Sequence, residues 1–289
     1  MASLTEIFLR VVKLCIATLF LVFKSAQTAF FRLVGRPIPS NFVVLMYHSI
    51  KRAERERFAR QMDQLVKLAD PVHADFTEGK TGWDRNYVAV TFDDGYQSVL
   101  ENAIPILLEK RIPATIFVPT KYLGGRPTWI TDQKHRNASE KLLSINDLKS
   151  LRKNGVFIGS HSVTHRPLTE LSQDEAFAEL IESREVLERI LGEKVGLFAL
   201  PYGSSSPDVL RLSRKAGYER VFLSDPLYSS GNIEGHVRGR IDVSPGDWSL
   251  EFRLKIRDAY QWLPLAIAAK SRVIDLLRKF PFVMARTQE

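Results

Sequence analysis

Short apolar segments alternate with amphipathic segments from residue 41 to residue 250, and this alternation limits the fold more than any other feature. The apolar segments have the length of strands and cover 42–50, 87–95, 114–119, 156–162, 197–203, 220–225 and 239–243. Helical periodicity marks 57–69, 96–110, 145–153, 172–191 and 206–216. Buried strands that alternate with helices form parallel sheets covered by helices. The sequence therefore predicts an α/β fold whose parallel sheet is either open or closed into a barrel.

The two ends of the chain differ from this middle part in charge. Residues 1–40 hold five basic residues and one acidic residue, residues 251–289 hold eight and four, and residues 41–250 hold 28 of each sign. A nucleic-acid-binding protein would concentrate its basic residues on the folded core, so no nucleic-acid partner is predicted. We predict a membrane-proximal helix and linker over 1–40, a domain over 41–250, and an amphipathic helical segment over 251–289 that is broken near Pro264.

The N-terminal segment 7–23 is strongly apolar, but Arg10 and Lys13 interrupt it. The uninterrupted run, 14–23, is about half of the ~20 residues that a membrane span needs. The pattern is typical of a helix in the membrane interface or of a short signal-anchor, and a cleaved signal peptide is a further alternative. Basic flanks that only improve solubility are the alternative without a membrane. We expect association with an anionic membrane surface.

Polar clusters follow several predicted strands, at the edge where parallel-sheet folds place their active sites. Asp93 and Asp94 come at the end of segment 87–95, where two carboxylates are costly unless they are paired or bind a cation. Adjacent side chains of an extended segment point in opposite directions, so one carboxylate can bind a metal ion while the other faces a water molecule. The structural alternative is a helix N-cap, because Asp94 and Gly95 precede segment 96–110.

His161 and His165 follow another strand with a spacing that suits two imidazoles on one metal ion. Solvent-exposed histidines without a function are the alternative. With Asp94 they would form a three-ligand set that leaves positions open for water and substrate, which is typical of a catalytic site. Zn²⁺ is the predicted ion, with Co²⁺, Ni²⁺ and Mn²⁺ as alternatives. The single cysteine, Cys15, excludes an internal disulfide and a cysteine-based zinc cluster.

The turn Pro201-Tyr202-Gly203 follows the apolar residues 197–200 and completes a set of motifs. TFDDGY, PATIFVPT, HSVTH and PYG, in this order, resemble the polysaccharide deacetylase family (carbohydrate esterase family 4, the nodulation-type deacetylase domain). The resemblance covers about residues 42–243. It implies a distorted (β/α) barrel, a divalent metal ion and hydrolysis of acetamido groups on sugars. It also implies Asp93 as the general base, Asp94, His161 and His165 as metal ligands, and the Tyr202 N–H as oxyanion donor.

The sequence departs from the family pattern at two places. Most members carry an arginine two residues before the motif proline, where this chain has Ala199; Arg238 or Arg240 could take its place. Most members also end with a Leu-x-His strand, whereas LMYHSI near the start of this chain resembles a permuted branch similar to poly-N-acetylglucosamine deacetylases. This resemblance implies His48 as the general acid, and His236 is the competing candidate.

Other residues are predicted to contact the substrate or to support the site. Tyr96, Pro201 and Trp248 are expected to bind substrate, and Asp242 is expected to support the base together with Arg240. The polar segment 131–140 could form a substrate-binding loop next to Trp129 and Tyr122, whose rings would stack on sugars or pack in the core.

The predicted reaction is removal of N-acetyl groups from the amino sugars of a polysaccharide, with release of acetate. An O-acetyl esterase or a small-molecule amidase on the same metal site is the second hypothesis. A non-catalytic glycan-binding module is the third, because Ala199 replaces the family arginine. A polysaccharide substrate predicts action at the extracytoplasmic (periplasmic) face of a membrane, and a cytoplasmic-face enzyme acting on lipid-linked glycans is the alternative.

Overall fold

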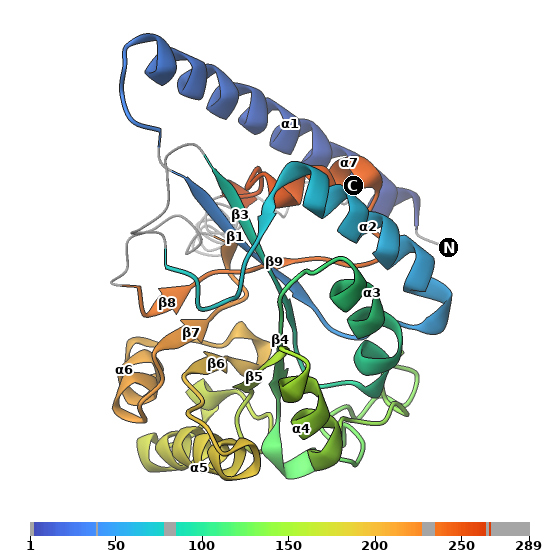
Figure 1. Ribbon diagram of the computed structural model, residues 1–289, viewed down its shortest axis with the longest axis vertical. Helices are drawn as coiled ribbons and strands as arrows, with labels where there is room; N and C mark the ends of the chain where they lie inside the picture. The colour runs from blue at the N-terminus through green and yellow to red at the C-terminus, as the bar shows by residue number, and fades with distance from the viewer. Residues whose placement is uncertain (1–2, 39, 78–84, 227–234, 264–265, 267–289) are drawn as a thin grey trace, which may run out of the picture.

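A parallel sheet forms the centre of the molecule (Figure 1). The computed structural model describes residues 3–38, 40–77, 85–226, 235–263 and 266. The strands are β1 (Asn41–Tyr47), β2 (Asp70–Pro71), β3 (Asn86–Phe92), β4 (Ala114–Val118), β5 (Phe157–Ser160), β6 (Leu197–Ala199), β7 (Arg220–Phe222), β8 (Val237–Arg238) and β9 (Ile241–Asp242). Their order in the sheet is β8-β7-β6-β5-β4-β3-β1-β9, with β2 beside β3, and all of these pairings are parallel.

The two edge strands show that the sheet curls into a barrel. β8 and β9 lie at opposite ends of the strand order, yet only Gly239 and Arg240 separate them in sequence. The Leu223 N–H of the segment after β7 donates to the Arg238 carbonyl (2.8 Å), and the Val243 N–H donates to the Met46 carbonyl of β1 (3.0 Å). So short a connection can join the two edges only if the sheet bends round to bring them together. The predicted distorted (β/α) barrel is confirmed.

The continuous apolar sequence of the strands has a simple cause, which β1 illustrates. Phe42 and Val44 contact the barrel interior, in a cluster that also holds Phe117 and Phe222. Val43 and other residues with the opposite orientation belong to the larger core between the sheet and the helices. Because successive side chains of a strand point to opposite faces, a strand covered on both sides is apolar at every position.

The helices lie outside the sheet (Figure 1). They are α2 (Arg55–Leu68), α3 (Ile104–Glu109), α4 (Ile145–Lys153), α5 (Gln173–Leu191), α6 (Pro207–Lys215) and α7 (Ser249–Ile256). The helix predicted over 96–110 is instead a π-helical segment, Val99–Ala103, followed by α3. α5 begins with a capping box between Ser172 and Glu175, and it ends at Gly192 in the left-handed region, with φ of 71°. Such end signals explain why the helix at 172–191 was predicted within one residue.

Helix α1 (Leu4–Leu33) crosses the outside of α7 (Figure 1). It contains the whole apolar segment 7–23 and extends beyond it to form one helix of 30 residues. Its buried residues Leu14 and Ala17 pack against Leu254, Ala259 and Tyr260. In the described part of the chain, no helix has both the length and the apolar character that a membrane span needs. Pro264 and residues 267–289, where the C-terminal helical segment was predicted to break and continue, lie outside the described residues.

Candidate active site

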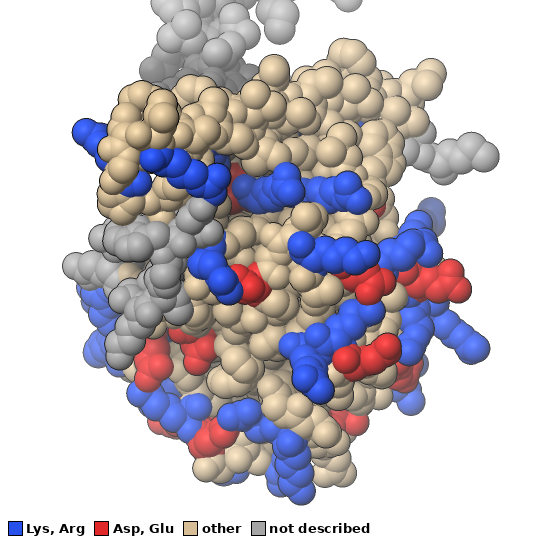
Figure 2. Space-filling model, turned by 45° about the horizontal axis from the view of Figure 1, so that its top comes forward, with Lys and Arg blue, Asp and Glu red and all other residues tan. Residues whose placement is uncertain are grey.

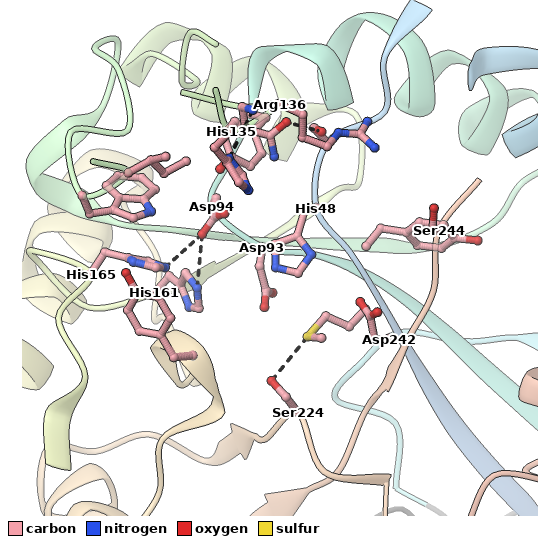
Figure 3. A pocket seen from close by; sticks show the side chains of 18 of the residues that line it. His48, Asp93, Asp94, His135, Arg136, His161, His165, Ser224, Asp242 and Ser244 are labelled. Atoms are coloured by element: carbon pink, nitrogen blue, oxygen red, sulfur yellow. Dashed lines mark hydrogen bonds and ion pairs between the residues drawn. The ribbon is translucent and has the colours of Figure 1, made fainter. Parts of the chain in front are cut away.

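A cavity of about 580 Å³ opens at the carboxyl ends of the strands, the edge where parallel barrels place their sites (Figure 3). β1 and β3 run side by side in register, so the residues that follow them, His48 and Asp93, reach the same cavity. The cavity is lined by all of the predicted catalytic residues and metal ligands: His48, Asp93, Asp94, His161, His165 and Tyr202.

Asp94, His161 and His165 converge in the wall of this cavity. All three side chains are buried, and one ligand atom of each lies within 4.8 Å of the others. Asp94 Oδ1 is 3.0 Å from His165 Nε2 and 3.5 Å from His161 Nε2 (Figure 3). These residues are distant in sequence, and the fold brings them together as the strand-end pattern predicts.

The backbone at these positions adopts conformations that non-glycine residues rarely take. Asp94 (φ 68°), Ser162 (φ 67°), His165 (φ 58°) and Tyr202 (φ 57°) all lie in the left-handed region. Such strain persists only where the surrounding structure enforces it, and it concentrates at functional sites. The tight turn after Asp94 also needs Gly95, because a Cβ at that position would lie 2.6 Å from Val118 Cγ1.

A carboxylate from α5 holds the turn that carries His165. Glu179 Oε2 accepts the N–H groups of Val163 and Thr164, both at 2.8 Å, and Glu179 Oε1 accepts the Thr164 hydroxyl at 2.5 Å. The His165 N–H donates to Ser162 Oγ (3.1 Å) inside the same turn. This role could not be predicted from the sequence, because a glutamate in an amphipathic helix normally faces solvent.

The two imidazoles are held in different ways. His161 Nδ1 lies 2.8 Å from the Ala199 carbonyl, so the N–H on Nδ1 donates there and Nε2 faces Asp94. His165 Nδ1 is buried and has no hydrogen-bond partner among the described residues. Its ring instead stacks on Trp129 (centroids 4.5 Å apart, planes at 25°) and meets the edge of Tyr202 at 4.8 Å. Aromatic packing therefore fixes the orientation of His165.

The charges of the cluster fit a cation. Burial raises the pKa of Asp94, but His161 and His165 bring that pKa well below its usual value. Burial lowers the pKa of His165, whereas the Asp93 and Asp94 carboxylates raise the pKa of His161 despite its burial. Asp94 Oδ1 is buried without a well-oriented hydrogen bond from any described residue. A carboxylate oxygen and two imidazole nitrogens that face one buried point are the donor set of a divalent metal ion.

Asp93 points the other way and pairs with Arg240. Arg240 Nη1 lies 2.6 Å from Asp93 Oδ1 and Nη2 lies 2.7 Å from Oδ2, a bidentate ion pair between two buried side chains. Burial raises the pKa of Asp93, but the guanidinium and then His161 outweigh it and lower that pKa. Of the two arginines considered as replacements at this position, Arg240 makes the contact, whereas Arg238 lies over the Phe42 ring.

Comparisons with known proteins agree with this geometry. A model of the polysaccharide deacetylase family matches residues 80–221. Over these residues, this chain is similar to the polysaccharide deacetylase family. YxkH of Bacillus subtilis, named as a polysaccharide deacetylase, is 26% identical over 219 residues, which are 72% of this chain and 73% of YxkH.

Two further relatives carry more specific names. The poly-beta-1,6-N-acetyl-D-glucosamine N-deacetylase of Staphylococcus aureus is 25% identical over 190 residues, covering 63% of this chain and 62% of that protein. The present chain thus spans less than two thirds of the length of the staphylococcal protein. The structure of IcaB from Ammonifex degensii superposes with a TM-score of 0.63 at 25% identity, covering 75% of this chain and 97% of that structure.

The opposite wall of the cavity carries the exposed His48. Figure 3 shows it beside Asp93, with Asp242 on its other side. Burial raises the pKa of Asp242, and the positive charges of Lys255 and His48 act against that rise. Asp242 was expected to support Asp93, but Arg240 is the residue that contacts Asp93, and Asp242 lies next to His48 instead.

The segment 129–137 forms a third wall, as the prediction of a substrate-binding loop requires. Trp129, His135, Arg136 and Asn137 line the cavity. Ser49 after β1 donates to the Asn137 side chain (2.8 Å) and fastens this segment next to His48. The sequence pattern pointed to the loop, but it did not identify Asn137 or Arg136.

Several predicted substrate contacts are placed elsewhere. Trp248 is not among the described cavity residues; it lies under the Arg10 guanidinium of α1, 4.5 Å from the ring centroid. Pro201 is buried behind the turn that carries Tyr202. Tyr96 lines the cavity but is 1% exposed, so its ring is not free to stack on a sugar. His236, the competing acid, contacts the Glu219 carbonyl and Ser213 outside the cavity.

Proposed function

We propose that this protein removes N-acetyl groups from amino sugars of a polysaccharide, with a divalent metal ion bound by Asp94, His161 and His165. The observation that carries the proposal is the separation of two adjacent carboxylates. Asp94 faces two imidazoles, and Asp93 is held beside them, ionised, by Arg240. A metal-assisted hydrolase needs both parts, a ligand set and a proton acceptor near it.

The donor set supports Zn²⁺ as the ion, since two imidazoles and one carboxylate are among its usual ligands. Co²⁺, Ni²⁺ and Mn²⁺ bind the same kinds of atoms. When bound, such an ion polarises an acyl oxygen and lowers the pKa of a water molecule. Trp129 and Tyr202 pack on His165 and limit the access of bulk water to that side of the cluster.

The protein's own side chains would move the protons. Asp93 accepts a proton from the attacking water, and Arg240 keeps its carboxylate ionised and oriented. The N–H of Tyr202 donates to the developing oxyanion; the next two N–H groups, of Gly203 and Ser204, already donate to carbonyls of the same turn. His48 gives a proton to the leaving amine when the C–N bond breaks. The products are acetate and a free amino sugar.

The non-catalytic alternative loses its main support in this geometry. It was based on Ala199, which stands where the family has an arginine. Arg240 provides a guanidinium to Asp93 from the connection between β8 and β9, and both side chains are buried. The polysaccharide substrate is supported by the name of the staphylococcal relative and by a cavity that is wide enough for a sugar.

Acetate release from a panel of substrates tests the proposal. Purified protein would first be analysed for metal, then stripped with a chelator and reloaded with Zn²⁺. We expect about one ion per chain, and acetate release from β-1,6-linked N-acetylglucosamine oligomers that depends on reloading. Faster turnover of O-acetylated glycans, p-nitrophenyl acetate or small non-sugar amides would favour an esterase or an amidase. Oligomer binding without acetate release at any metal loading would contradict the enzyme.

We further propose that the protein acts on the extracytoplasmic side of a membrane, because polysaccharides with N-acetylated amino sugars accumulate outside the cytoplasm. A fusion of the full chain to alkaline phosphatase, which is active only outside the cytoplasm, tests this. An inactive fusion, together with an active cytoplasmic reporter at the same position, would favour action on lipid-linked glycans at the cytoplasmic face.

A further inference from the structure

One face of α1 is firmly attached to the catalytic domain. Leu14 and Ala17 are buried on α7 and on the residues that follow it. Arg10 pairs with Glu251 (2.5 Å), and Lys24 pairs with Asp258 (3.4 Å) and donates to the Asn41 side chain (3.0 Å). Apolar and ionic contacts along more than ten residues therefore fix α1 flat against the domain.

The opposite face of α1 is apolar and exposed. Seven large apolar side chains of α1 are each at least 58% exposed, and five of them are Phe8, Leu19, Phe23, Phe30 and Leu33. These five follow one another at intervals of 11, 4, 7 and 3 residues, so they lie on one face of a helix that is about 45 Å long. We call these five residues the outer stripe. Apolar patches of this length are uncommon on soluble monomers and mark contacts with membranes or other proteins.

The charges around the outer stripe decide between these partners. Glu6 is the only acidic residue of α1, whereas Lys13, Arg32 and Arg36 are exposed on α1 or just after it. Figure 2 shows a broad area without charged residues where α1 crosses the molecule, bordered by Lys and Arg side chains. A second copy of the chain would bring like charges together, whereas anionic lipid headgroups would complement them.

We propose that the outer stripe of α1 inserts into the interface of an anionic lipid bilayer and holds the catalytic domain against it. The contacts of Arg10 connect this surface to the active site. Arg10 Nη2 donates to the Gly246 carbonyl (2.9 Å), and the preceding residue, Pro245, lines the cavity. A membrane-bound α1 thus holds one rim of the cavity close to the lipid surface. If the proposed function holds, the substrate is a glycan at or near that surface.

The chain contains a natural reporter for this proposal. Cys15 is its only cysteine and is exposed. It lies seven residues after Phe8 and four before Leu19, so it is on the same face of α1 as the outer stripe. An environment-sensitive fluorophore on Cys15 of the full-length, metal-loaded protein should shift to shorter wavelength with phosphatidylglycerol vesicles. We expect partitioning at least about tenfold weaker with phosphatidylcholine vesicles. As a control, the fluorophore would be placed at position 149 with the variant Cys15→Ser/Lys149→Cys, which should bind without a shift.

The decisive variant places negative charge within the apolar outer stripe. Leu19→Glu/Phe23→Glu changes only exposed side chains, so folding should be retained, and vesicle binding should fall at least about tenfold. Leu108→Glu changes an apolar residue of α3 that is also exposed, and vesicle binding should not change.

Three results would overturn the proposal. The first is vesicle binding that is absent or unaffected by the double variant. The second is a labelled Cys15 that is already shielded in the monomer without lipid, which would mean that another segment of the chain covers the stripe. The third is dimerisation that the double variant abolishes, without vesicle binding. Because no substrate is used, these outcomes are independent of whether the protein is a deacetylase.

Discussion

Asp93 and Asp94 are neighbours in sequence but belong to two differently built halves of the site. Asp93 is oriented by Arg240, which comes from the two-residue connection that closes the barrel between β8 and β9. Asp94 faces His161 and His165, which come from a strained turn braced by Glu179. One half depends on closure of the whole sheet, and the other depends on local turn geometry.

This difference explains how two like charges can sit side by side in a buried place. Each carboxylate is turned away from the other, toward its own positive or cation-binding partners, and both pKa values are lowered despite burial. The left-handed backbone of Asp94 produces the divergence. We therefore expect substitutions in the two halves to have separable effects on proton transfer and on metal binding.

The largest expected effect is on hydrolysis when Asp93 is replaced. Asp93→Asn keeps the shape and one hydrogen bond to Arg240 but removes the proton acceptor. We expect the rate of acetate release to fall by about 10²–10⁴, the usual contribution of a positioned general base, while the metal content stays near that of the unchanged protein. Acetate release and metal analysis on the same sample measure both quantities.

Asp94→Asn is the matched control for this prediction, because it makes the same chemical change one residue later. It should lose metal first, and excess metal should restore part of its activity. Equal loss of metal in both variants would show that the two halves are not separate.

The next effect concerns stability in the Asp93 half. Arg240→Met leaves a buried carboxylate without its partner, and the free energy of unfolding should fall by about 3–5 kcal/mol. The double variant Asp93→Asn/Arg240→Met removes the uncompensated charge and should recover part of that loss, as coupled residues do. Urea denaturation of the single and double variants gives the coupling energy. A coupling near zero would mean that the ion pair does not hold Asp93 in place.

Local patterns were enough to predict the half around Asp94. The period of the strands, the turn residues after them and the spacing of His161 and His165 are all encoded over a few neighbouring positions. Parallel strands then carry these clusters to one edge of the sheet. This is why the three candidate ligands could be named from the sequence.

The half around Asp93 could be predicted only in part, because it depends on long-range closure. Arg238 and Arg240 could not be distinguished, because the chain changes its pairing partner between them. Arg238 belongs to β8, which pairs with β7, whereas the strand after Arg240 is β9, which pairs with β1. Strand periodicity does not continue across that change. Glu179 was missed because its partners lie 15 and 16 residues earlier, in the turn after β5, and helical periodicity does not reveal them. Trp248 was misplaced because nothing in its own segment shows that Arg10 of α1 lies over it.

In the Asp94 half, loss of the brace should weaken metal binding. Glu179→Gln keeps the size of the side chain but lacks the charge that accepts two N–H groups and a hydroxyl. We expect metal affinity to fall by about 10–100-fold, as is typical when a residue that orients a ligand is changed. Competition with a chelating dye measures this affinity. Glu182→Gln, an exposed change on the same helix, should leave it unaltered.

The smallest effect on metal affinity is expected at Trp129, whose ring packs on His165, a side chain whose Nδ1 has no hydrogen bond from the described residues. Trp129→Ala removes the ring that stacks on His165, an interaction of about 0.5–1.5 kcal/mol, so metal affinity should fall by about 2–12-fold. Trp129→Phe keeps an aromatic face and should restore most of it. Trp248→Ala removes the same residue type outside the cavity and is the matched control. If both tryptophan-to-alanine variants lowered metal affinity equally, the loss would reflect general destabilisation, and His165 would be held by its turn alone.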